Sequence, residues 1–439
     1  MPRLTERARL VGTLSSYLEC LMLAADVDES AEDEVEEVAG ILQVVEEHRY
    51  LRREREPDEQ RLRDGFARCE SLLEWNNDDF RRAFRVTREQ FDAIVALLAG
   101  DRVFRRREKG RPQSPVRHQV LLVLWRLAHS GTGATVFHIA ERFGVSEGTV
   151  AAWTNRVLTA IIGIEDKFLW WPSPGERKQL RQDLSDHHGL AGCIGFIDGT
   201  HINLAGTPAR RDAADFFNRH HRHSFNVLAV CDSSLRIRFL HLGFPRSAHD
   251  QRVYRACALA QKPNEHFSTD EYILGDSGYT CDAHLVSLFR RYRGQDCLNP
   301  EQVAFNRHAS PRRVAVEHAF GVLKLRWQSL RALPVSLKTE LEEARAACWI
   351  RACVVLHNIL IDDAADPGQW LTGTERGTAQ REHGMDFSRW EEEGDVGVAP
   401  VDLKDEVEDV IEGASEGQVL RRRVQTYASM WRAQRWGSD

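Results

Sequence analysis

One short apolar stretch, residues 191 to 200, constrains the fold of this chain more than any other feature. It places the carboxylate of Asp198 at the end of an apolar run that begins at Cys193, and Gly199 follows directly. An apolar run of this length predicts a buried strand, and the glycine predicts that the strand ends there. Open α/β sheets place their sites at the carboxyl ends of strands, so Asp198 is a candidate metal ligand.

A second carboxylate stands in the same setting. Asp276 closes the apolar run Tyr-Ile-Leu-Gly, and Gly278 follows it. If the two runs form neighbouring parallel strands, their ends lie together. Two carboxylates held close repel each other unless a cation lies between them, and hard oxygen ligands suit Mg²⁺ or Mn²⁺ rather than zinc. The sequence therefore predicts a divalent-metal site at this sheet edge.

The middle of the chain is patterned as strands. The expected strands are 193–198, 225–231, 236–242 and 271–275. Residues 232–234 should join the second and third as a hairpin, and helices are expected near 249–260 and 281–292. Three strands, a helix and a fourth strand form the order of a ribonuclease-H-like core. The predicted fold class is thus α/β, a mixed sheet flanked by helices.

Two further carboxylates are candidates for the same site. Glu317 is expected in a helix that Ser310 and Pro311 begin, on a flank shared with three basic residues, Arg313, Lys324 and Arg331. A phosphate backbone passing over this helix would explain that flank, whereas a surface glutamate paired with Arg313 is the plainer alternative. Asp250 follows the third predicted strand and is either a helix N-cap or a further oxygen ligand, with the ligand slightly favoured.

Four acidic residues at one site predict two-metal phosphoryl chemistry, with about two ions per site activating a nucleophile and steadying the leaving oxygen. A cationic and aromatic stretch would lie nearby, and its basic members are Arg210, Arg211, Arg219 and Arg222. Phe216, Phe217 and three histidines are interleaved with them, which suits stacking on nucleic acid. The histidines could bind zinc instead, but no cysteine pair accompanies them.

A helix-turn-helix is predicted between residues 117 and 160. The expected helices are 120–128, 136–143 and 147–158, with a tight turn at 144–146. Ser146 would cap the last helix, and Ala140, Val145, Val150 and Val157 would face inward. The outward groups would be Thr149, Trp153, Asn155 and Arg156. Helical hairpins of this shape also occur without DNA. The basic run 102–118 is either an arm along a phosphate backbone or a solvated linker.

The expected domain organisation has four parts. These are a charged helical extension (1–74), an all-helical region with the helix-turn-helix (75–165), the α/β domain (190–362) and an acidic tail, largely disordered, with a last helix (363–439).

The composition limits the class of protein and its location. The formal charge of −7 argues against wholesale wrapping of nucleic acid, although the internal stretches are basic. Nine cysteines without a CxxC pair favour reduced thiols in the cytosol or nucleus. No apolar run approaches the length of a membrane span, about 18 residues, so no membrane is expected.

Five segments in one order resemble a known family. They are 195–202 (Gly-Phe-Ile-Asp-Gly-Thr-His-Ile), 247–254 (Ser-Ala-His-Asp-Gln-Arg-Val-Tyr), 274–279 (Leu-Gly-Asp-Ser-Gly-Tyr), 312–327 (which contains Val-Glu-His-Ala-Phe-Gly) and 355–360 (Val-Leu-His-Asn-Ile-Leu). Together they resemble the nuclease domain of PIF/Harbinger transposases and their domesticated nuclease relatives. The resemblance covers about residues 75 to 362. The acidic tail departs from the family pattern, so nothing follows about self-association through that end.

The resemblance implies a DDE-type nuclease with Asp198, Asp276 and Glu317 as the catalytic triad and Asp250 as a further metal position. It also implies double-stranded DNA as the substrate and a separate Myb-like protein as a partner. We expect the protein in the nucleus, with the cytoplasm as a second location, and we expect a homo-oligomer. The expected function is a metal-dependent DNA endonuclease or transposase, a hydrolase of phosphodiester bonds. The alternative is a catalytically silent DNA-binding regulator derived from a transposase, although all four acidic positions are present.

Overall fold

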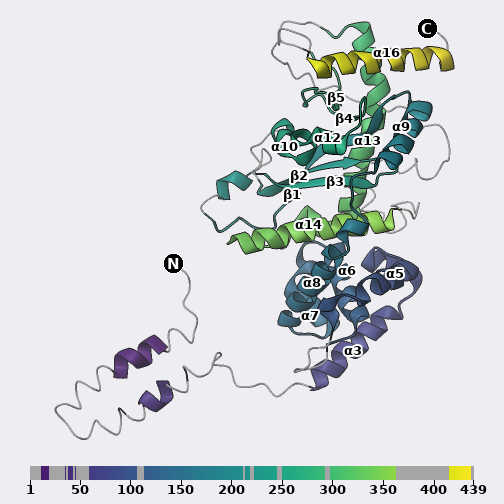
Figure 1. The fold of residues 1–439 in the computed structure, drawn as a ribbon. Helices are drawn as coiled ribbons and strands as arrows, with labels where there is room; N and C mark the ends of the chain where they lie inside the picture. The colour runs from purple at the N-terminus through teal and green to yellow at the C-terminus, as the bar shows by residue number, and fades with distance from the viewer. Residues whose placement is uncertain are drawn as a thin grey trace. The chain divides into compact units, whose positions relative to one another are not determined.

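The protein is seen in a computed structural model (Figure 1), which describes residues 11–18, 35, 38–42, 45, 59–105, 113–210, 213–217, 222–244, 250–291, 297–361 and 415–436. The chain forms two compact units, residues 1–63 and 64–439. Everything below concerns the second unit. Several predictions lie outside the described residues: the basic run at 106–112, Arg211, Arg219, His220, His221, and the tail from 362 to 414. No described helix is both long and apolar enough to cross a membrane.

A five-stranded mixed sheet forms the centre of this unit, in the order β3-β2-β1-β4-β5. Its strands are β1 (Cys193–Asn203), β2 (Ser224–Cys231), β3 (Ile237–Phe244), β4 (Tyr272–Gly275) and β5 (Leu285–Ser287). The first three pair antiparallel, β4 pairs parallel with β1, and β5 pairs parallel with β4. The predicted α/β class, a mixed sheet flanked by helices, is confirmed.

Strand β1 is longer than predicted. Gly199 does not end it, because the strand continues to Asn203 and stays paired with β2 over that whole length. Asp198 therefore lies within the strand and not at its carboxyl end. The parallel partner β4 pairs only as far as Phe196, so Asp198 stands where the parallel half of the sheet opens.

The helix predicted near 281–292 is wrong, because residues 285–287 form the edge strand β5. The helix predicted near 249–260 is divided into α10 (Asp250–Ala256) and α11 (Ala258–Gln261), followed by α12 (Pro263–His266). The hairpin turn between β2 and β3 is confirmed. There Asp232 Oδ1 accepts from the backbone nitrogens of Ser234 (2.9 Å) and Arg236 (3.1 Å).

Each face of the sheet is buried by different elements. On one face Phe196 packs in the same apolar cluster as Val316 and Phe320 of α13 (Pro300–Arg326), which also includes side chains of α14 (Glu340–Leu360). On the other face Ile197 packs with Tyr254 of α10. Helix α9 (Pro174–His188) also contacts β1, and α16 (Glu416–Trp436) contacts β5. The core is therefore a helix-covered sheet (Figure 1).

Helix α13 begins eleven residues earlier than the sequence indicated. Asn299 caps it through the backbone nitrogen of Gln302 (2.8 Å), Pro300 occupies its first turn, and Pro311 lies in its interior. The predicted start at Ser310 and Pro311 is therefore wrong. The helix buries an apolar stripe formed by Val316, Phe320, Leu323 and Trp327.

A group of helices precedes the sheet. They are α3 (Glu59–Leu73), α4 (Asn77–Phe84), α5 (Arg88–Ala99), α6 (Val116–Ala128), α7 (Val136–Phe143) and α8 (Glu147–Ile162). The last three lie where the sequence placed them, and the Ser146 hydroxyl caps α8 as expected. Trp153, predicted to face outward, is only 6% exposed and packs in the core. Leu97 of α5 is 42% exposed.

Candidate active site

Two aspartates lie side by side on neighbouring strands. The parallel register joins Phe196 of β1 to Leu274 of β4, so two residues further along Asp198 stands beside Asp276. Asp198 Oδ1 accepts from the backbone nitrogen of Gly199 (2.8 Å), and Asp276 Oδ1 accepts from that of Gly278 (2.9 Å). Both side chains are half-buried. The pairing predicted from the two apolar runs is thus present, although only one of the two strands ends there.

Helix α13 brings a third carboxylate to the same place. Arg313 Nη1 donates to Asp198 Oδ2 at 3.3 Å, and Arg313 Nη2 donates to Glu317 Oε1 one turn further along the helix. The guanidinium therefore lies between the strand carboxylate and the helix carboxylate. Arg313, which the sequence suggested as a DNA contact, is only 13% exposed and is directed at acidic groups of its own chain.

Asp250 approaches from the other side of β1. A Cβ built on Gly199 would lie 2.3 Å from Asp250 Oδ1, which no side chain could tolerate. The Asp250 carboxylate thus packs directly on the backbone next to Asp198, at the first residue of α10. The sequence interpretation took Gly199 as the end of a strand. Its actual role is to leave space for this carboxylate.

The charges of these groups affect one another. Burial raises the pKa of Asp198 to about 7, and the charges of Asp276 and Glu317 add to that rise, while Arg313 opposes it. The phenol of Tyr279 is buried beside the site, and its pKa is raised by burial first and then by Asp198, Asp250 and Asp276. The four predicted acidic residues are therefore gathered in one electrostatic neighbourhood.

The donor chemistry of this site fits a divalent cation. All four groups are carboxylates. Burial is the main cause of the raised pKa of Asp198, with Asp276 and Glu317 adding to it, and a bound cation would favour the charged carboxylate. In the present side-chain arrangement, no three His, Cys, Asp or Glu residues of the described chain are placed to hold a metal ion together. The guanidinium of Arg313 lies between Asp198 and Glu317, so ion binding requires this side chain to move.

A partly buried lysine lies next to the carboxylates. Lys324 Nζ donates to Thr200 Oγ1 (2.6 Å) and to the His201 carbonyl (3.1 Å), so it holds α13 against the continuation of β1. Burial and the charge of Arg331 lower the pKa of Lys324 to about 8, and Asp198 opposes that change. The sequence analysis placed Lys324 on the flank of Glu317 but did not identify Thr200 and His201 as its partners. Both residues lie close after Asp198 in the sequence, which could have indicated that they belong to the site.

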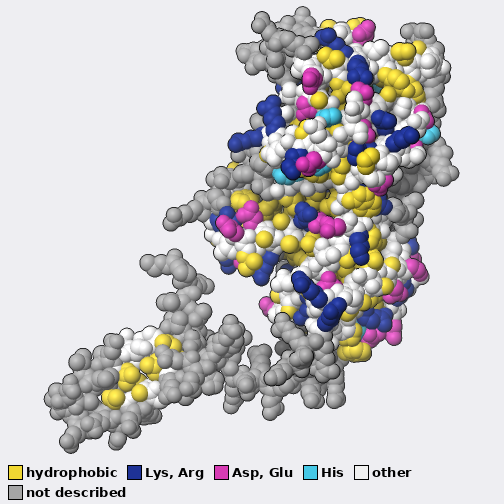
Figure 2. Space-filling model, in the orientation of Figure 1, with side chains coloured by type: hydrophobic (Ala, Val, Ile, Leu, Met, Phe, Trp, Pro, Cys, Tyr) yellow, Lys and Arg dark blue, Asp and Glu magenta, His cyan; other side chains and the backbone are white. Residues whose placement is uncertain are grey.

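The other predicted nucleic-acid contacts lie apart from the carboxylates. Arg210 pairs with Glu343 of α14 at 2.5 Å, and Arg156 Nη1 donates to Gln119 Oε1 at 2.7 Å. The Thr149 hydroxyl hydrogen-bonds with that of Ser146, and Asn155 is exposed on α8. On the face shown in Figure 2, basic and acidic side chains are interspersed. Arg210 and Arg156 are thus partly committed to contacts within the chain.

A mixed sheet with carboxylates from two neighbouring strands and a following helix defines a nuclease-like domain of the ribonuclease-H type. Residues 197–358 match the family described as DDE superfamily endonuclease. These residues are therefore similar to DDE superfamily endonucleases, and the resemblance to Harbinger-derived transposases and nucleases is confirmed.

Three similar proteins carry related names. The chain is 27% identical to "Protein ALP1-like" from Arabidopsis thaliana, over 68% of this chain and 74% of that protein. It is 24% identical to "Putative nuclease HARBI1" from Homo sapiens, over 63% of this chain and 76% of that protein. It is 23% identical to "Probable transposase for insertion sequence element IS702" from Microchaete diplosiphon, over 56% of this chain and 83% of that protein. No solved structure matches the chain.

Proposed function

We propose that this protein is a divalent-metal-dependent DNA endonuclease, either a transposase or a nuclease derived from one. The observation that carries the proposal is the gathering of Asp198, Asp276 and Glu317 from two adjacent strands and one helix, in a domain of the DDE endonuclease family. The names of the relatives, a putative nuclease and a probable transposase, support the same reaction class.

In this proposal Asp198, Asp276 and Glu317 are the catalytic carboxylates, and together with Asp250 they would hold Mg²⁺ or Mn²⁺. Two such ions supply activation of a water or 3′-hydroxyl and stabilisation of the leaving oxygen. Arg313 keeps Asp198 and Glu317 close before the ions bind. Lys324 fixes the strand backbone on which Asp198 lies through its bonds to Thr200 and His201.

Double-stranded DNA is the proposed substrate, and α7 and α8 are the proposed helix-turn-helix. Thr149, near the capped start of α8, is suitably placed to approach DNA, and Asn155 and Arg156 follow on the same helix. Arg331, whose charge acts on Lys324, has its Nε and Nη2 buried without a hydrogen-bond partner in the described part of the chain, so its proposed phosphate contact requires this side chain to turn outward. Arg210, Arg211 and Lys324 complete the proposed DNA-binding set.

A Myb-like accessory protein, a homo-oligomer and a nuclear location, with the cytoplasm as a second one, are carried forward as proposals from the family resemblance. They concern surfaces and segments beyond the carboxylate site. Co-purification of the expressed chain with nuclear DNA-binding proteins, together with its mass in solution, tests the first two, and imaging of a tagged chain in cells tests the third.

The decisive experiment compares the native protein with Asp198→Asn on duplex DNA in Mg²⁺, in Mn²⁺ and in a chelator. The proposal requires cleavage by the native protein in either ion, no cleavage by Asp198→Asn, and equal DNA binding by both. Asp92→Asn, on the exposed surface of α5, is the matched control and should cleave normally. If the native protein binds DNA but never cuts it, the chain is instead a catalytically silent regulator.

A further inference from the structure

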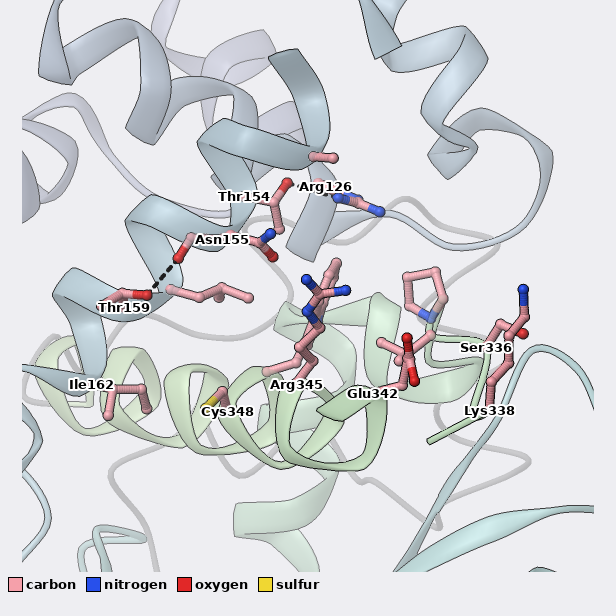
Figure 3. A pocket seen from close by; sticks show the side chains of 15 residues that line it. Arg126, Thr154, Asn155, Thr159, Ile162, Ser336, Lys338, Glu342, Arg345 and Cys348 are labelled. Atoms are coloured by element: carbon pink, nitrogen blue, oxygen red, sulfur yellow. Dashed lines mark hydrogen bonds between the residues drawn. The ribbon is translucent and has the colours of Figure 1, made fainter. Parts of the chain in front are cut away.

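A cavity of about 610 Å³ lies between α8 and α14, well apart from the carboxylates (Figure 3). Helix α8 forms one wall, α14 forms the facing wall, and residues 334–338 close one side. Its volume falls within the range of pockets that bind small organic molecules, roughly 300–1,000 Å³. Of the residues proposed above for the nuclease reaction and for DNA binding, Asn155 alone is among those that line this cavity.

A buried arginine without a countercharge lines the cavity. Arg126 is only 8% exposed; its Nη1 donates to Thr154 Oγ1 at 2.7 Å, and its guanidinium lies 5.0 Å from the centre of the Trp349 ring. Its Nε is buried with no hydrogen-bond partner among the described residues. Burial alone lowers the pKa of Arg126 to about 10, and no carboxylate contributes. A buried cation of this kind is costly unless an anion joins it.

Two more cations line the same cavity. Arg345 extends from α14 toward the space below Arg126, and Lys338 lies at the side (Figure 3). The one lining carboxylate, Glu342, accepts from the Thr339 backbone nitrogen (2.9 Å) as part of the cap of α14, and hydrogen bonding with Thr339 and the charge of Arg345 both help to lower its pKa. The lining therefore has a net positive charge, with two guanidinium groups on opposite walls.

The rest of the lining is apolar with a few hydrogen-bonding groups. Leu158, Ile162 and Val335 supply apolar surface, and the side chains of Asn155 and Ser336 supply polar atoms toward the cavity. A bare inorganic anion would leave the apolar surface uncovered. A ligand that fits both parts carries an anionic group at one end and a flat or apolar body at the other.

We propose that this cavity binds a nucleotide. Its phosphate would lie between Arg126 and Arg345, because guanidinium groups match phosphate oxygens in pairs of parallel hydrogen bonds. Its base would cover Leu158 and Ile162, with Asn155 available to its polar edge. The nucleotide is either free in solution or the terminal, phosphorylated nucleotide of a DNA strand, since both present the same chemistry.

The test measures binding of five probes by titration calorimetry: dAMP, deoxyadenosine, inorganic phosphate, a DNA duplex with a 5′-phosphate and the same duplex without it. The variants are Arg126→Met and Arg345→Met. The matched control is Arg142→Met, which removes a guanidinium that lies 4.3 Å from the centre of the Trp125 ring, outside this cavity. Circular dichroism and the Tm verify that each variant is folded, and Arg345, which is exposed, keeps the test valid if Arg126→Met misfolds.

The proposal requires that dAMP or the phosphorylated duplex bind more tightly than the matching probe without phosphate. Both cavity variants should lose about tenfold or more of that binding, and Arg142→Met should lose none. A preference for dAMP identifies a free nucleotide, and a preference confined to the phosphorylated duplex identifies a DNA end. Equal binding with and without phosphate, or variants that bind as the native protein does, overturns the proposal. Asp198→Asn should leave this binding unchanged, so failure here is distinct from failure of the nuclease proposal.

Discussion

Arg313 Nη1 lies 3.3 Å from Asp198 Oδ2, although the two residues are 115 positions apart in the sequence. This contact joins the central strand of the sheet to its longest covering helix. Because the same guanidinium also contacts Glu317, it keeps carboxylates of like charge together when no ion is bound. The geometry of the site before metal binding thus depends on one side chain.

We expect Arg313→Gln to lower stability in the absence of metal. Loss of the guanidinium leaves Asp198 and Glu317 facing each other without a cation, at a cost of about 1–3 kcal/mol. Mn²⁺ should recover that loss, because an ion that binds only the folded state stabilises it. The measurement is the Tm in chelator and in Mn²⁺. Arg307→Gln, at an exposed position of the same helix, is the control. An unchanged Tm in chelator contradicts the role assigned to Arg313.

We expect Gly199→Ala to weaken metal binding. The new methyl group would lie 2.3 Å from Asp250 Oδ1 and would push that carboxylate away from the site. Displacing a group that supports metal ligands typically costs about ten- to a hundredfold in affinity. Titration with Mn²⁺, followed by paramagnetic resonance, gives the affinity. Gly206→Ala is the control, because its methyl group would have nothing within 4 Å. If both variants bind Mn²⁺ as the native protein does, Asp250 takes no part.

We expect the protein to lose stability as the pH falls from about 6.5 toward 4, in part through His357. Burial lowers the pKa of His357 from 6.5 to about 4, and Arg326 and Arg236 add to this effect. Between pH 6.5 and 4, His357 is protonated in the unfolded chain but stays neutral in the folded chain. The free energy of unfolding therefore drops by at most about 1.4 kcal/mol per pH unit for this group. Above 6.5 the group has no effect, and below 4 its effect is constant.

His357→Gln should flatten this dependence. The Tm measured from pH 7.5 to 4 in the native protein and the variant gives the two slopes. His138→Gln, at an exposed position on α7, should keep the native slope. His308, whose pKa is also lowered to about 4 by burial, accounts for part of the slope that persists. Identical slopes in the native protein and His357→Gln rule out a contribution from His357.

We expect Gly417→Ala to destabilise the contact between α16 and the sheet edge. A Cβ at this position would lie 2.3 Å from the carbonyl carbon of Cys281, so the helix would have to shift, at a cost of about 1–3 kcal/mol. Urea unfolding measures the loss, and Gly100→Ala, where the added methyl group meets nothing within 4 Å, is the control. A variant that unfolds at the native urea concentration shows that α16 contributes little to stability.

The sequence predicted the elements whose side chains repeat a single pattern. The apolar runs before Asp198 and Asp276 indicated adjacent strands, and the flank of Glu317 indicated a helix beside them. The extension of β1 was missed because residues 199–203 mix glycine and polar residues and carry a single buried aliphatic side chain, Ile202. Strand β5 is only three residues long, which is too short for a period of two to emerge.

Other features depend on contacts that no local pattern encodes. We predicted that the helix starts at Pro311, because proline favours the first turn of a helix. In the structure the helix is capped by Asn299 and continues through Pro311. The apolar helix predicted at 120–128 gave no sign of a role for Arg126, and the position of this residue opposite Arg345 follows only from the packing of α6, α8 and α14 around the cavity. The four carboxylates were found from the sequence, whereas the arginine that holds two of them together was assigned to DNA.

Helix α16 lies beside β5, which is one of the two edge strands of the described sheet. Arg421 reaches past that strand to the carbonyl of Leu288 (3.4 Å), and Gly417 contacts the backbone at Cys281 and Asp282. Helix α16 is synthesised after all five strands and after residues 362–414, which lie between α14 and α16. The edge of the sheet at β5 therefore stays uncovered while those residues are made. Premature stop codons within that interval would release chains able to join edge to edge, and the helix thereby protects against aggregation.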